Sequence, residues 1–473
     1  MSAGVQAPAG SSALQAPRNP TRRNLELVLL VFAWGIGVLG TMQIGWATGE
    51  GMTSQLWITA GVVGGLALAM HLVVRWKASY ADPILLPIAT LLTILGLVMI
   101  FRIDVANAQR AERSGSTAPT PEVYSQLTWF AIAVILFIAV LFLLRDHRVL
   151  QRYTYTLGLV GLILLVLPLA PIIGTTVNGA TLWVRIGGLT FQPAEMAKIL
   201  LTIFFAGYLV EKRDSLAIVR TKVVGIGIPR AKDLGPILIA WAVSLGVLVF
   251  ERDLGTSLLF FGLFVCMLYI ATQRRSWLIL GGLLFVLGAF VAYQLFGHVR
   301  LRVMIWLDPW TYANDEGYQI VQSLFGFANG GMLGAGLGQG FPNLVPFANT
   351  DFIVAALGEE IGLTGLVAML LLYAILIERG LRTAVGVKDS FGQLLAAGLS
   401  ITLALQVFVI IGGVTKLIPL TGLTTPFLSY GGSSLIANWI IIALLLRISD
   451  RARRPLPVVP SPDDAMTQVV RRT

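Results

Sequence analysis

Long apolar runs recur along most of this chain, and they restrict its fold more than any other feature. Between Leu25 and Leu446 the runs are about 17 to 27 residues long, and a helix of about 20 residues crosses the roughly 30 Å hydrocarbon layer of a bilayer. Hydrophobic residues make up 56% of the chain and charged residues 12%, whereas soluble domains carry about 25% charged residues. The sequence therefore predicts a multi-pass membrane protein.

The apolar runs are continuous rather than alternating, which favours helices over a transmembrane β-barrel. We predict an all-α, polytopic membrane helical bundle of about 12 transmembrane helices. The expected spans are residues 25–47, 55–75, 83–101, 126–144, 154–173, 193–210, 234–250, 255–272, 277–297, 351–377, 392–413 and 432–448. The span 193–210 has the weakest hydropathy because it is short and carries Glu195 and Lys198.

The basic residues predict the orientation of these spans in the plasma membrane. Most of the 34 lysines and arginines fall on one side if the N-terminus is cytoplasmic, as the positive-inside rule requires. The tails 1–24 and 451–473 are rich in Ala, Pro, Ser and Arg, so we expect both to be disordered and cytoplasmic, around a single membrane domain at 25–450. The net charge of +10 is then a topology signal, and nothing in the sequence indicates nucleic-acid binding.

The chain offers little for a cysteine-based or cofactor site. Its one cysteine, Cys266, lies in an apolar run, and its three histidines are far apart, which excludes a disulfide framework and a zinc motif. The glycine-rich run "NGGMLGAGLGQG" (329–340) does not match the dinucleotide pattern G-x-G-x-x-G and follows no expected strand. We therefore expect no organic cofactor.

Polar groups gather in four segments that the predicted orientation places outside the membrane or at its external boundary. These segments are residues 175–195, 251–256, 298–350 and 415–434. The segment 298–350, between the ninth and tenth spans, is too long for a simple connection. Within it, Gln319–Phe327 has the apolar spacing of an amphipathic helix.

Several residues in these segments have two interpretations. Glu195 and Lys198 are three residues apart on an expected helix, so they form either an ion pair that locks two helices or part of a site. Asp253 lies in a short connection, where it is either a solvated turn residue or a site residue. In "LTGLTTPFLSYGGSS" (420–434), paired glycines and hydroxyls permit the close approach of either a ligand or another helix.

The distribution of charge favours one class of function. Both signs of charge share the external face, whereas transporters usually place such groups near the membrane midplane. This pattern favours an external enzyme that acts on a membrane-held substrate with an anionic headgroup. Glu359 and Glu360 are exceptions: in a continuous span at 351–377 they lie roughly 12–14 Å along the helix from Asp351. We expect them to be structural or cavity groups that face the interior, either paired or partly protonated.

Five motifs follow one another in the order that is typical of one family. They are "NGATLWVRIGGLTFQPAEMAK" (178–198), "ERDLGTS" (251–257), "WLDPWTYANDEGYQIVQSLFGFANGGMLGAGLG" (306–338), "NTDFIVAALGEEIGLTG" (349–365) and "LTTPFLSYGGSS" (423–434). Over residues 83–448 the chain thus resembles the ten-helix core of the RodA/FtsW/SpoVE (SEDS) family. The two added helices at 25–75 resemble those of its actinobacterial RodA branch.

The resemblance implies a peptidoglycan glycosyltransferase that polymerises lipid II on the outer face of the plasma membrane, for cell elongation and shape. The implied partners are an undecaprenyl-pyrophosphate-linked glycan and a class B penicillin-binding protein. Asp351 takes the position of the family's essential acid, which makes it the expected catalytic residue and the expected ligand of a divalent cation, Mg²⁺ or Mn²⁺.

Two further motifs carry over with substitutions. Glu195 and Lys198 fall on the acid of the family's Gln-Pro-Ser-Glu motif and on its paired lysine, with Ala194 in the Ser position. Asp253 falls on the acid of Pro-Asp-Leu-Gly-Thr, with Arg252 in place of the proline. The resemblance therefore implies that all three ionisable residues, Glu195, Lys198 and Asp253, contribute to substrate binding.

A third motif departs from the family pattern. Many members have Arg-Trp where this chain has Leu182-Trp183, and Arg185 either replaces the missing charge or does not. The substrate-binding residues predicted beyond the acids and the lysine are Arg185, Arg302, Trp183, Ser429, Tyr430 and Ser433.

Two other functions stay open at the level of sequence. A lipid II flippase would need substrate-lining charges through the membrane depth, which this chain largely lacks. A non-catalytic scaffold for a class B penicillin-binding protein would leave the external acid Asp351 and the Glu195/Lys198 pair unexplained.

Overall fold

The computed structural model contains a bundle of long helices. It describes residues 21–51, 54–170, 173–177, 180–186, 189–217, 219–223, 226–229, 239, 242–243, 246–247, 249–251 and 253–455. Among these residues, ten helices are long and apolar enough to cross a membrane. They are α1 (Arg23–Thr48), α2 (Ser54–Lys77), α3 (Leu85–Ser114), α4 (Glu122–Leu143), α7 (Pro193–Ala217), α9 (Leu254–Thr272), α10 (Arg275–Leu295), α13 (Ile353–Gly386), α14 (Ser390–Val414) and α15 (Gly432–Arg453).

Two of the twelve expected spans do not correspond to a membrane-length helix among the described residues. The expected span 154–173 falls on a shorter apolar helix, α6 (Thr154–Val166), which follows the single turn α5 (Val149–Arg152) and continues into the 3₁₀ turn η1 (Leu167–Leu169). The expected span 234–250 lies largely outside the described residues, as do the N-terminal tail up to residue 20 and the C-terminal tail from residue 456. The prediction of a multi-pass helical membrane protein is confirmed.

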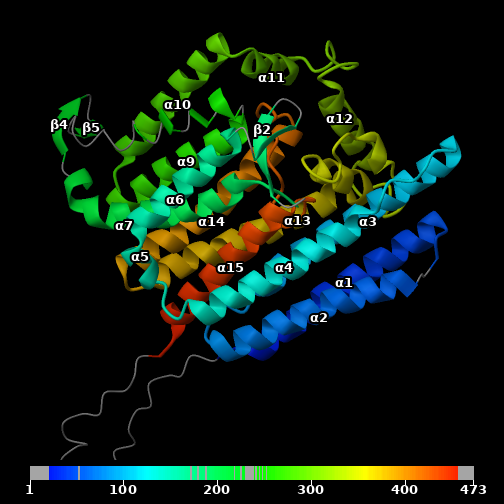
Figure 1. The fold of residues 1–473 in the computed structure, drawn as a ribbon, viewed down its shortest axis with the longest axis horizontal. Helices are drawn as coiled ribbons and strands as arrows, with labels where there is room; N and C mark the ends of the chain where they lie inside the picture. Colours follow the sequence, from blue (N-terminus) through cyan, green and yellow to red (C-terminus); the bar gives the residue numbers. More distant parts are fainter. Residues whose placement is uncertain are drawn as a thin grey trace, which may run out of the picture.

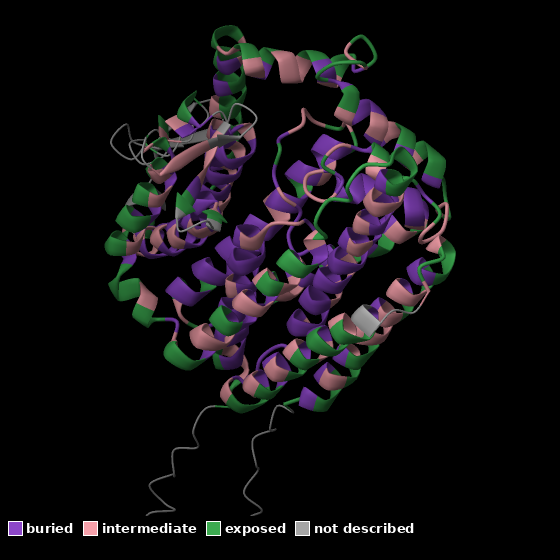
Figure 2. Cartoon of the chain, turned by 45° about the vertical axis from the view of Figure 1, so that its right-hand side comes forward, coloured by how far each residue is buried: buried purple, intermediate pink, exposed green. Residues whose placement is uncertain are grey.

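The core of the bundle lies where α13, α14 and α15 pack against α3, α4 and α7 (Figure 1). Buried residues gather in this central group, whereas α2 and α10 expose much of their surface (Figure 2). Trp439 of α15 is fully buried, and its ring lies 5.6–5.9 Å from those of Phe130, Phe137 and Phe427. Such aromatic clusters stabilise a core beyond the area that they bury.

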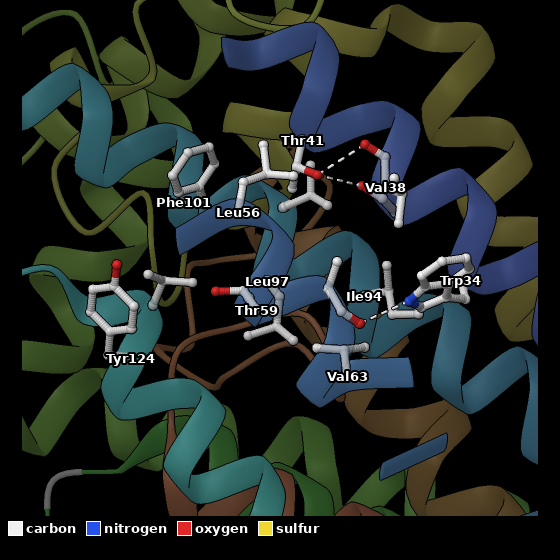
Figure 3. A pocket seen from close by; sticks show the side chains of 14 residues that line it. Trp34, Val38, Thr41, Leu56, Thr59, Val63, Ile94, Leu97, Phe101 and Tyr124 are labelled. Atoms are coloured by element: carbon white, nitrogen blue, oxygen red, sulfur yellow. Dashed lines mark hydrogen bonds between the residues drawn. The ribbon is translucent and has the colours of Figure 1, made fainter. Parts of the chain in front are cut away.

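The two N-terminal helices form a hairpin that packs on α3 along one edge of the bundle (Figure 1). At its cytoplasmic end, by the predicted orientation, Arg23 donates hydrogen bonds to the Glu26 carboxylate and to the Ala81 carbonyl, and His71 Nδ1 lies 2.8 Å from Glu26 Oε1. Further along, Trp34 Nε1 donates to the Ala60 carbonyl at 2.8 Å, beside a small apolar pocket between the hairpin, α3 and α4 (Figure 3). Within this hairpin the Glu26 carboxylate therefore contacts both Arg23 and His71.

Short strands occur in two connections, where the all-α prediction expected none. Strands β1 (Gly174–Val177), β2 (Ala180–Ile186) and β3 (Leu189–Phe191) form an antiparallel sheet in that order, and β4 (Val219–Val223) pairs with β5 (Ile226–Pro229). Successive side chains of a strand point to opposite faces, so Trp183 and Arg185 share one face of β2 while Val184 on the other face is buried. The small sheet thus presents two of the predicted site residues together.

The long segment 298–350 is mostly folded. Between α10 and α13 the chain forms α11 (Gly297–Leu307), α12 (Tyr318–Gly330) and the 3₁₀ turn η3 (Pro342–Leu344). The helix expected at Gln319–Phe327 is α12, which buries one face, including Ile320 and Gly326, against α13. At Gly330 the two helices are so close that an added Cβ would lie 2.0 Å from the Gly358 carbonyl oxygen.

The span expected at 351–377 is broken near its start. Gly362 has φ 67° and ψ −174°, a backbone conformation that essentially only glycine adopts. Just before this break, the carbonyls of Glu359 and Glu360 accept hydrogen bonds from Ala335 N (2.9 Å) and Gly336 N (3.0 Å). The glycine-rich loop therefore replaces helical hydrogen bonds that the break removes.

We expect Gly362→Ala to destabilise the protein. The added Cβ would lie 2.3 Å from Gly334 N, and the backbone conformation alone costs of order 1–3 kcal/mol for a residue other than glycine. Gly282→Ala in α10 is the control, because nothing lies within 4 Å of its added Cβ. The thermal midpoint of the detergent-solubilised protein should fall in the first variant and not in the second; equal midpoints would contradict this account of the break.

Candidate active site

A polar cavity of about 500 Å³ lies at the end of the bundle where the β1–β3 sheet, α11 and the segment before α13 meet. It is lined by Trp129, Thr175, Leu182, Trp183, Arg185, Thr190, Gln192, Asp253, Arg302, Gln319, Phe347, Thr350, Asp351, Leu420, Thr421, Gly422, Thr424, Tyr430, Gly431 and Gly432. This volume is in the range of small-molecule sites. Segments that are hundreds of residues apart in the chain therefore form one cavity.

The cavity brings together six of the ten predicted site residues: Trp183, Arg185, Asp253, Arg302, Asp351 and Tyr430. The side chains of Asp351 and Arg302 both lie beside Gly422. A Cβ built on Gly422 would lie 3.7 Å from Asp351 Oδ2 and 3.9 Å from Arg302 Nη2. Arg302 Nη1 donates to the Leu420 carbonyl at 2.8 Å, which fixes the guanidinium at the cavity wall. Asp351 itself lies two residues before the first residue of α13 and not within the helix.

The two acids of the cavity differ in their hydrogen bonding. Asp253 is the N-cap of α9: Thr256 N donates to its Oδ1 at 3.0 Å, and the Thr256 hydroxyl donates to its Oδ2. For Asp351, the described part of the chain supplies no ion pair within 4 Å and no recorded hydrogen bond to the carboxylate. Asp253 is therefore occupied in capping, whereas Asp351 has oxygens that can accept a proton.

Burial and neighbouring charges both shift the pKa values of Asp351, Asp253 and Arg302. Burial raises the pKa of Asp351 to about 6; the Arg302 charge opposes this rise, and the Asp253 charge adds to it. Burial also raises the pKa of Asp253, against the hydrogen bonds from Thr256. The pKa of Arg302 is lowered by burial, while both acids act to raise it. A carboxyl with a pKa near the working pH is suited to acid–base chemistry.

Ser429 and Tyr430 hold the chain that carries Asp351. The Ser429 hydroxyl donates to the Thr350 carbonyl at 2.5 Å and accepts from Thr425 N at 2.8 Å. Tyr430 N donates to the Asn349 carbonyl at 2.7 Å. The predicted substrate-binding residue Ser429 does not line the cavity but fixes the residue before the acid, while Tyr430 does both.

Glu195, Lys198 and Ser433 lie behind the cavity wall rather than in it. Lys198 is buried and lies 2.5 Å from Glu195 Oε2, as the expected pairing required, and its Nζ donates to Gln406 Oε1 at 2.8 Å. The Gln406 amide in turn donates to the carbonyl of Thr424, which lines the cavity, at 2.9 Å.

Ser433 makes a separate contact at the same wall. Its hydroxyl accepts from Gln192 N at 2.9 Å, just before α7 begins. Because Gln192 lines the cavity, Ser433 and the Glu195/Lys198 pair both contact the lining from behind. Arg252, the proline replacement, lies outside the described residues.

Several lining residues were not predicted. Trp129 comes from the first turns of an apolar span, where an aromatic residue gives no sign of a site, and an added Cβ on Gly432 would lie 2.2 Å from its ring. Gln319 lies in the first turn of α12, and the sequence around it indicated a helix but not a site. Thr421 and Thr424 belong to the hydroxyl-rich run 420–434, so composition indicated their segment but not their orientation.

The cavity contains two carboxylates, Asp253 and Asp351, that could contribute to a divalent-cation site. Within the described ranges, no group of three or more His, Cys, Asp or Glu that could hold a metal ion is found. Mg²⁺ commonly uses one or two carboxylates together with substrate phosphates and water. Asp351 fits such a shared site, whereas a cation held by protein ligands alone does not fit the described residues.

The fold and the site define a multi-pass membrane protein with a half-buried acid and an arginine in a polar cavity at one end of the bundle. The chain belongs to the cell cycle protein family of FtsW, RodA and SpoVE, which matches residues 83–454.

Named relatives and solved structures agree with this membership. The chain is 50% identical over 463 residues, 96% of its length and 97% of the relative's, to the peptidoglycan glycosyltransferase RodA of Mycobacterium tuberculosis. It is 34% identical to the probable peptidoglycan glycosyltransferase FtsW of Geobacter sulfurreducens, over 79% of this chain and 96% of the relative.

Two solved structures resemble the fold. The rod shape determining protein RodA of Thermus thermophilus has a TM-score of 0.55 at 26% identity, over 79% of this chain and 98% of that one. A chain of a peptidoglycan synthase complex, studied for the coordination of polymerization and crosslinking, has a TM-score of 0.54 at 25% identity, over 84% and 98%.

We expect Ser429→Ala to loosen the segment that carries Asp351. The change removes the hydroxyl that joins Thr425 N to the Thr350 carbonyl. Because one hydrogen bond contributes about 1 kcal/mol, amide hydrogen exchange across residues 347–352 should become roughly fivefold faster. Ser400→Ala is the control, since that buried hydroxyl bonds within its own helix, to the Ala396 carbonyl. Equal exchange in the two variants would show that Ser429 does not hold this segment.

Proposed function

We propose that this protein is a peptidoglycan glycosyltransferase that polymerises lipid II at the cavity, with Asp351 as its catalytic residue. The function follows the named relatives, which are peptidoglycan glycosyltransferases of matching length. One observation carries the assignment of the residue: Asp351 is the acid of the cavity whose oxygens are not used by a cap, and its pKa is raised to about 6.

The reaction joins two sugars. A sugar 4-hydroxyl attacks the anomeric carbon of the other substrate, the new glycosidic bond forms, and the bond to undecaprenyl pyrophosphate breaks. Asp351 accepts the proton of the attacking hydroxyl, which general-base catalysis requires within hydrogen-bond reach. Above a pH of about 6 the carboxylate is ionised and able to take that proton.

The leaving group is a pyrophosphate, and its departure places negative charge in the cavity. Arg302 and Arg185 line the same cavity and supply positive charge for it. Fixed donors of this kind act where charge develops in the transition state. The Arg302 guanidinium is held at the Leu420 carbonyl, so it does not need to reorganise when the pyrophosphate leaves. Trp129, Trp183 and Tyr430 supply aromatic surface for the sugars.

A divalent cation, Mg²⁺ or Mn²⁺, is part of this proposal. Asp351 would share it with the pyrophosphate of the substrate, and the cation would supply charge stabilisation for the leaving group. With the cation bound, Arg302 and Arg185 would still bind the pyrophosphate of the substrate. Asp253 would still cap α9 close to Arg302.

The site faces the outer side of the membrane in this proposal, with both termini in the cytoplasm. The basic residues of the connections support that orientation. A class B penicillin-binding protein is the proposed partner, supported by the likeness to a chain of a peptidoglycan synthase complex.

We expect Asp351→Asn to reduce lipid II polymerisation by at least about a hundredfold, because general-base catalysis contributes typically 10²–10⁴. The measurement is gel analysis of glycan products from purified full-length protein with its penicillin-binding partner and divalent metal. Asp308→Asn is the control, since Asp308 lies in the same external segment but is exposed and bonds to Thr311. Polymer formation by Asp351→Asn at the rate of the parent protein would overturn the assignment.

Gel analysis together with a translocation assay in reconstituted vesicles separates the other two functions. A flippase would move fluorescent lipid II across reconstituted vesicles without making polymer, and a scaffold would do neither on its own. Either result, obtained with folded protein, would count against a glycosyltransferase.

We expect the polymerisation rate to fall as the pH drops through about 6, since Asp351 must be ionised to accept a proton. Arg302→Gln removes the positive charge that lowers the pKa of Asp351. The acidic limb of the pH–rate profile should therefore move to higher pH. Arg300→Gln is the control, because Arg300 is exposed and bonds to the Gln294 carbonyl. An acidic limb that is unchanged in Arg302→Gln would show that Arg302 does not act on Asp351.

A further inference from the structure

A second polar cavity, of about 460 Å³, lies between the last turns of α1 and α3 and the segment that follows the glycine-rich loop. Its polar lining consists of Thr48, Arg102, Gln109, Arg110, Arg113 and Asn343, with the backbone of Gly338–Phe341. No lining residue is shared with the cavity that holds Asp351. It is therefore a separate site on the same protein.

Arg102 is the buried donor of this second cavity. The side chain is only 4% exposed, its Nε donates to Glu360 Oε1 at 2.7 Å and its Nη2 donates to the Gly340 carbonyl at 2.7 Å. Its Nη1 is buried and has no hydrogen-bond partner among the described residues. A buried donor without an acceptor costs free energy, so the cavity is arranged to receive an acceptor from outside the chain.

Two further arginines add positive charge at the same place. Arg102, Gln109 and Arg113 follow helical spacing along one face of α3, and Arg110 lies beside them. Neither Arg110 nor Arg113 has an ion pair within 4 Å among the described residues. Glu360 is the acid in contact with Arg102, and its second oxygen accepts from Gly338 N at 2.8 Å. The Glu359 carboxylate also lies against the lining at Gly340 and Phe341, so three arginines face two carboxylates and the lining carries an excess of positive charge.

The position along α3 indicates what kind of anion is available. The apolar part of α3 ends near Phe101, so residues 102–113 lie at or beyond the membrane boundary. This level is where phosphate headgroups of lipids lie and where soluble anions have access. Arginine is the side chain that binds phosphate oxygens through several N–H groups at once.

We propose that this second cavity binds a phosphate-bearing anion, either a lipid headgroup or a free phosphate. The Nη1 of Arg102 donates to a phosphate oxygen, and Arg110 and Arg113 close around it from the open side. The bound anion joins α3 to the backbone at Gly338–Phe341, where Phe341 N already donates to Glu359 Oε1 at 3.0 Å. Binding therefore stabilises the external segment without contacting the site of the proposed reaction.

The test measures the thermal midpoint of the purified full-length protein in detergent. Inorganic phosphate is titrated against chloride at constant ionic strength, and dihexanoyl phosphatidylglycerol is titrated against dihexanoyl phosphatidylcholine. The variant is Arg110→Gln with Arg113→Gln, two exposed residues whose change leaves the Arg102–Glu360 pair in place. The matched control is Arg274→Gln with Arg275→Gln, an exposed pair at the start of α10.

We expect the anion to raise the thermal midpoint of the parent protein and of the control, and to act at least roughly tenfold more weakly on the Arg110/Arg113 variant. Stabilisation by inorganic phosphate supports a site for free phosphate, and stabilisation by phosphatidylglycerol alone supports a lipid headgroup. The proposal is overturned if neither anion exceeds its comparison solute, or if the Arg110/Arg113 variant responds as the parent does.

Discussion

Backbone N–H and C=O groups at membrane depth must find partners inside the protein, and this constraint determines the arrangement around α13. The break at Gly362 removes helical hydrogen bonds from a buried part of the bundle. The glycine-rich loop restores them: Ala335 and Gly336 donate to the carbonyls before the break, and Leu363 N donates to the Gly331 carbonyl after it. The loop, the start of α13 and the adjacent Asp351 are thereby joined into one unit.

The candidate site depends on the unequal use of two acids that interact with one arginine. Asp253 is satisfied by Thr256 and keeps a fixed place at the start of α9, whereas Asp351 keeps oxygens for a substrate. Arg302 attracts both acids and is itself held at the Leu420 carbonyl. Two nearby carboxylates can thus have different chemical roles, because their hydrogen bonds differ and not because their residue types do.

Sequence reasoning reached the class of fold and several residues that line the cavity. Continuous apolar runs are a direct consequence of bilayer thickness, and the external polar motifs indicated Asp351, Arg302, Asp253, Trp183 and Arg185. It did not find the strands beside Trp183, because short strands in a polar connection have no period that hydropathy detects.

Three other features could not be predicted from the sequence, for a related reason. Trp129 lines the cavity from an apolar span, Ser429 acts through the Thr350 carbonyl, and the conformation of Gly362 depends on a loop some thirty residues earlier in the chain. Each of these depends on tertiary contacts that no local pattern encodes.

The N-terminal hairpin has a consequence for membrane insertion. Its ionisable residues Arg23, Glu26 and His71 contact one another across α1 and α2, and the contact of Arg23 with the Ala81 carbonyl lies just beyond the second helix. An unpaired charge is costly in lipid, yet this hairpin carries its own counter-charge. For insertion this means that the Glu26 carboxylate has its partners within the hairpin itself, without a side chain from the helices of the family region.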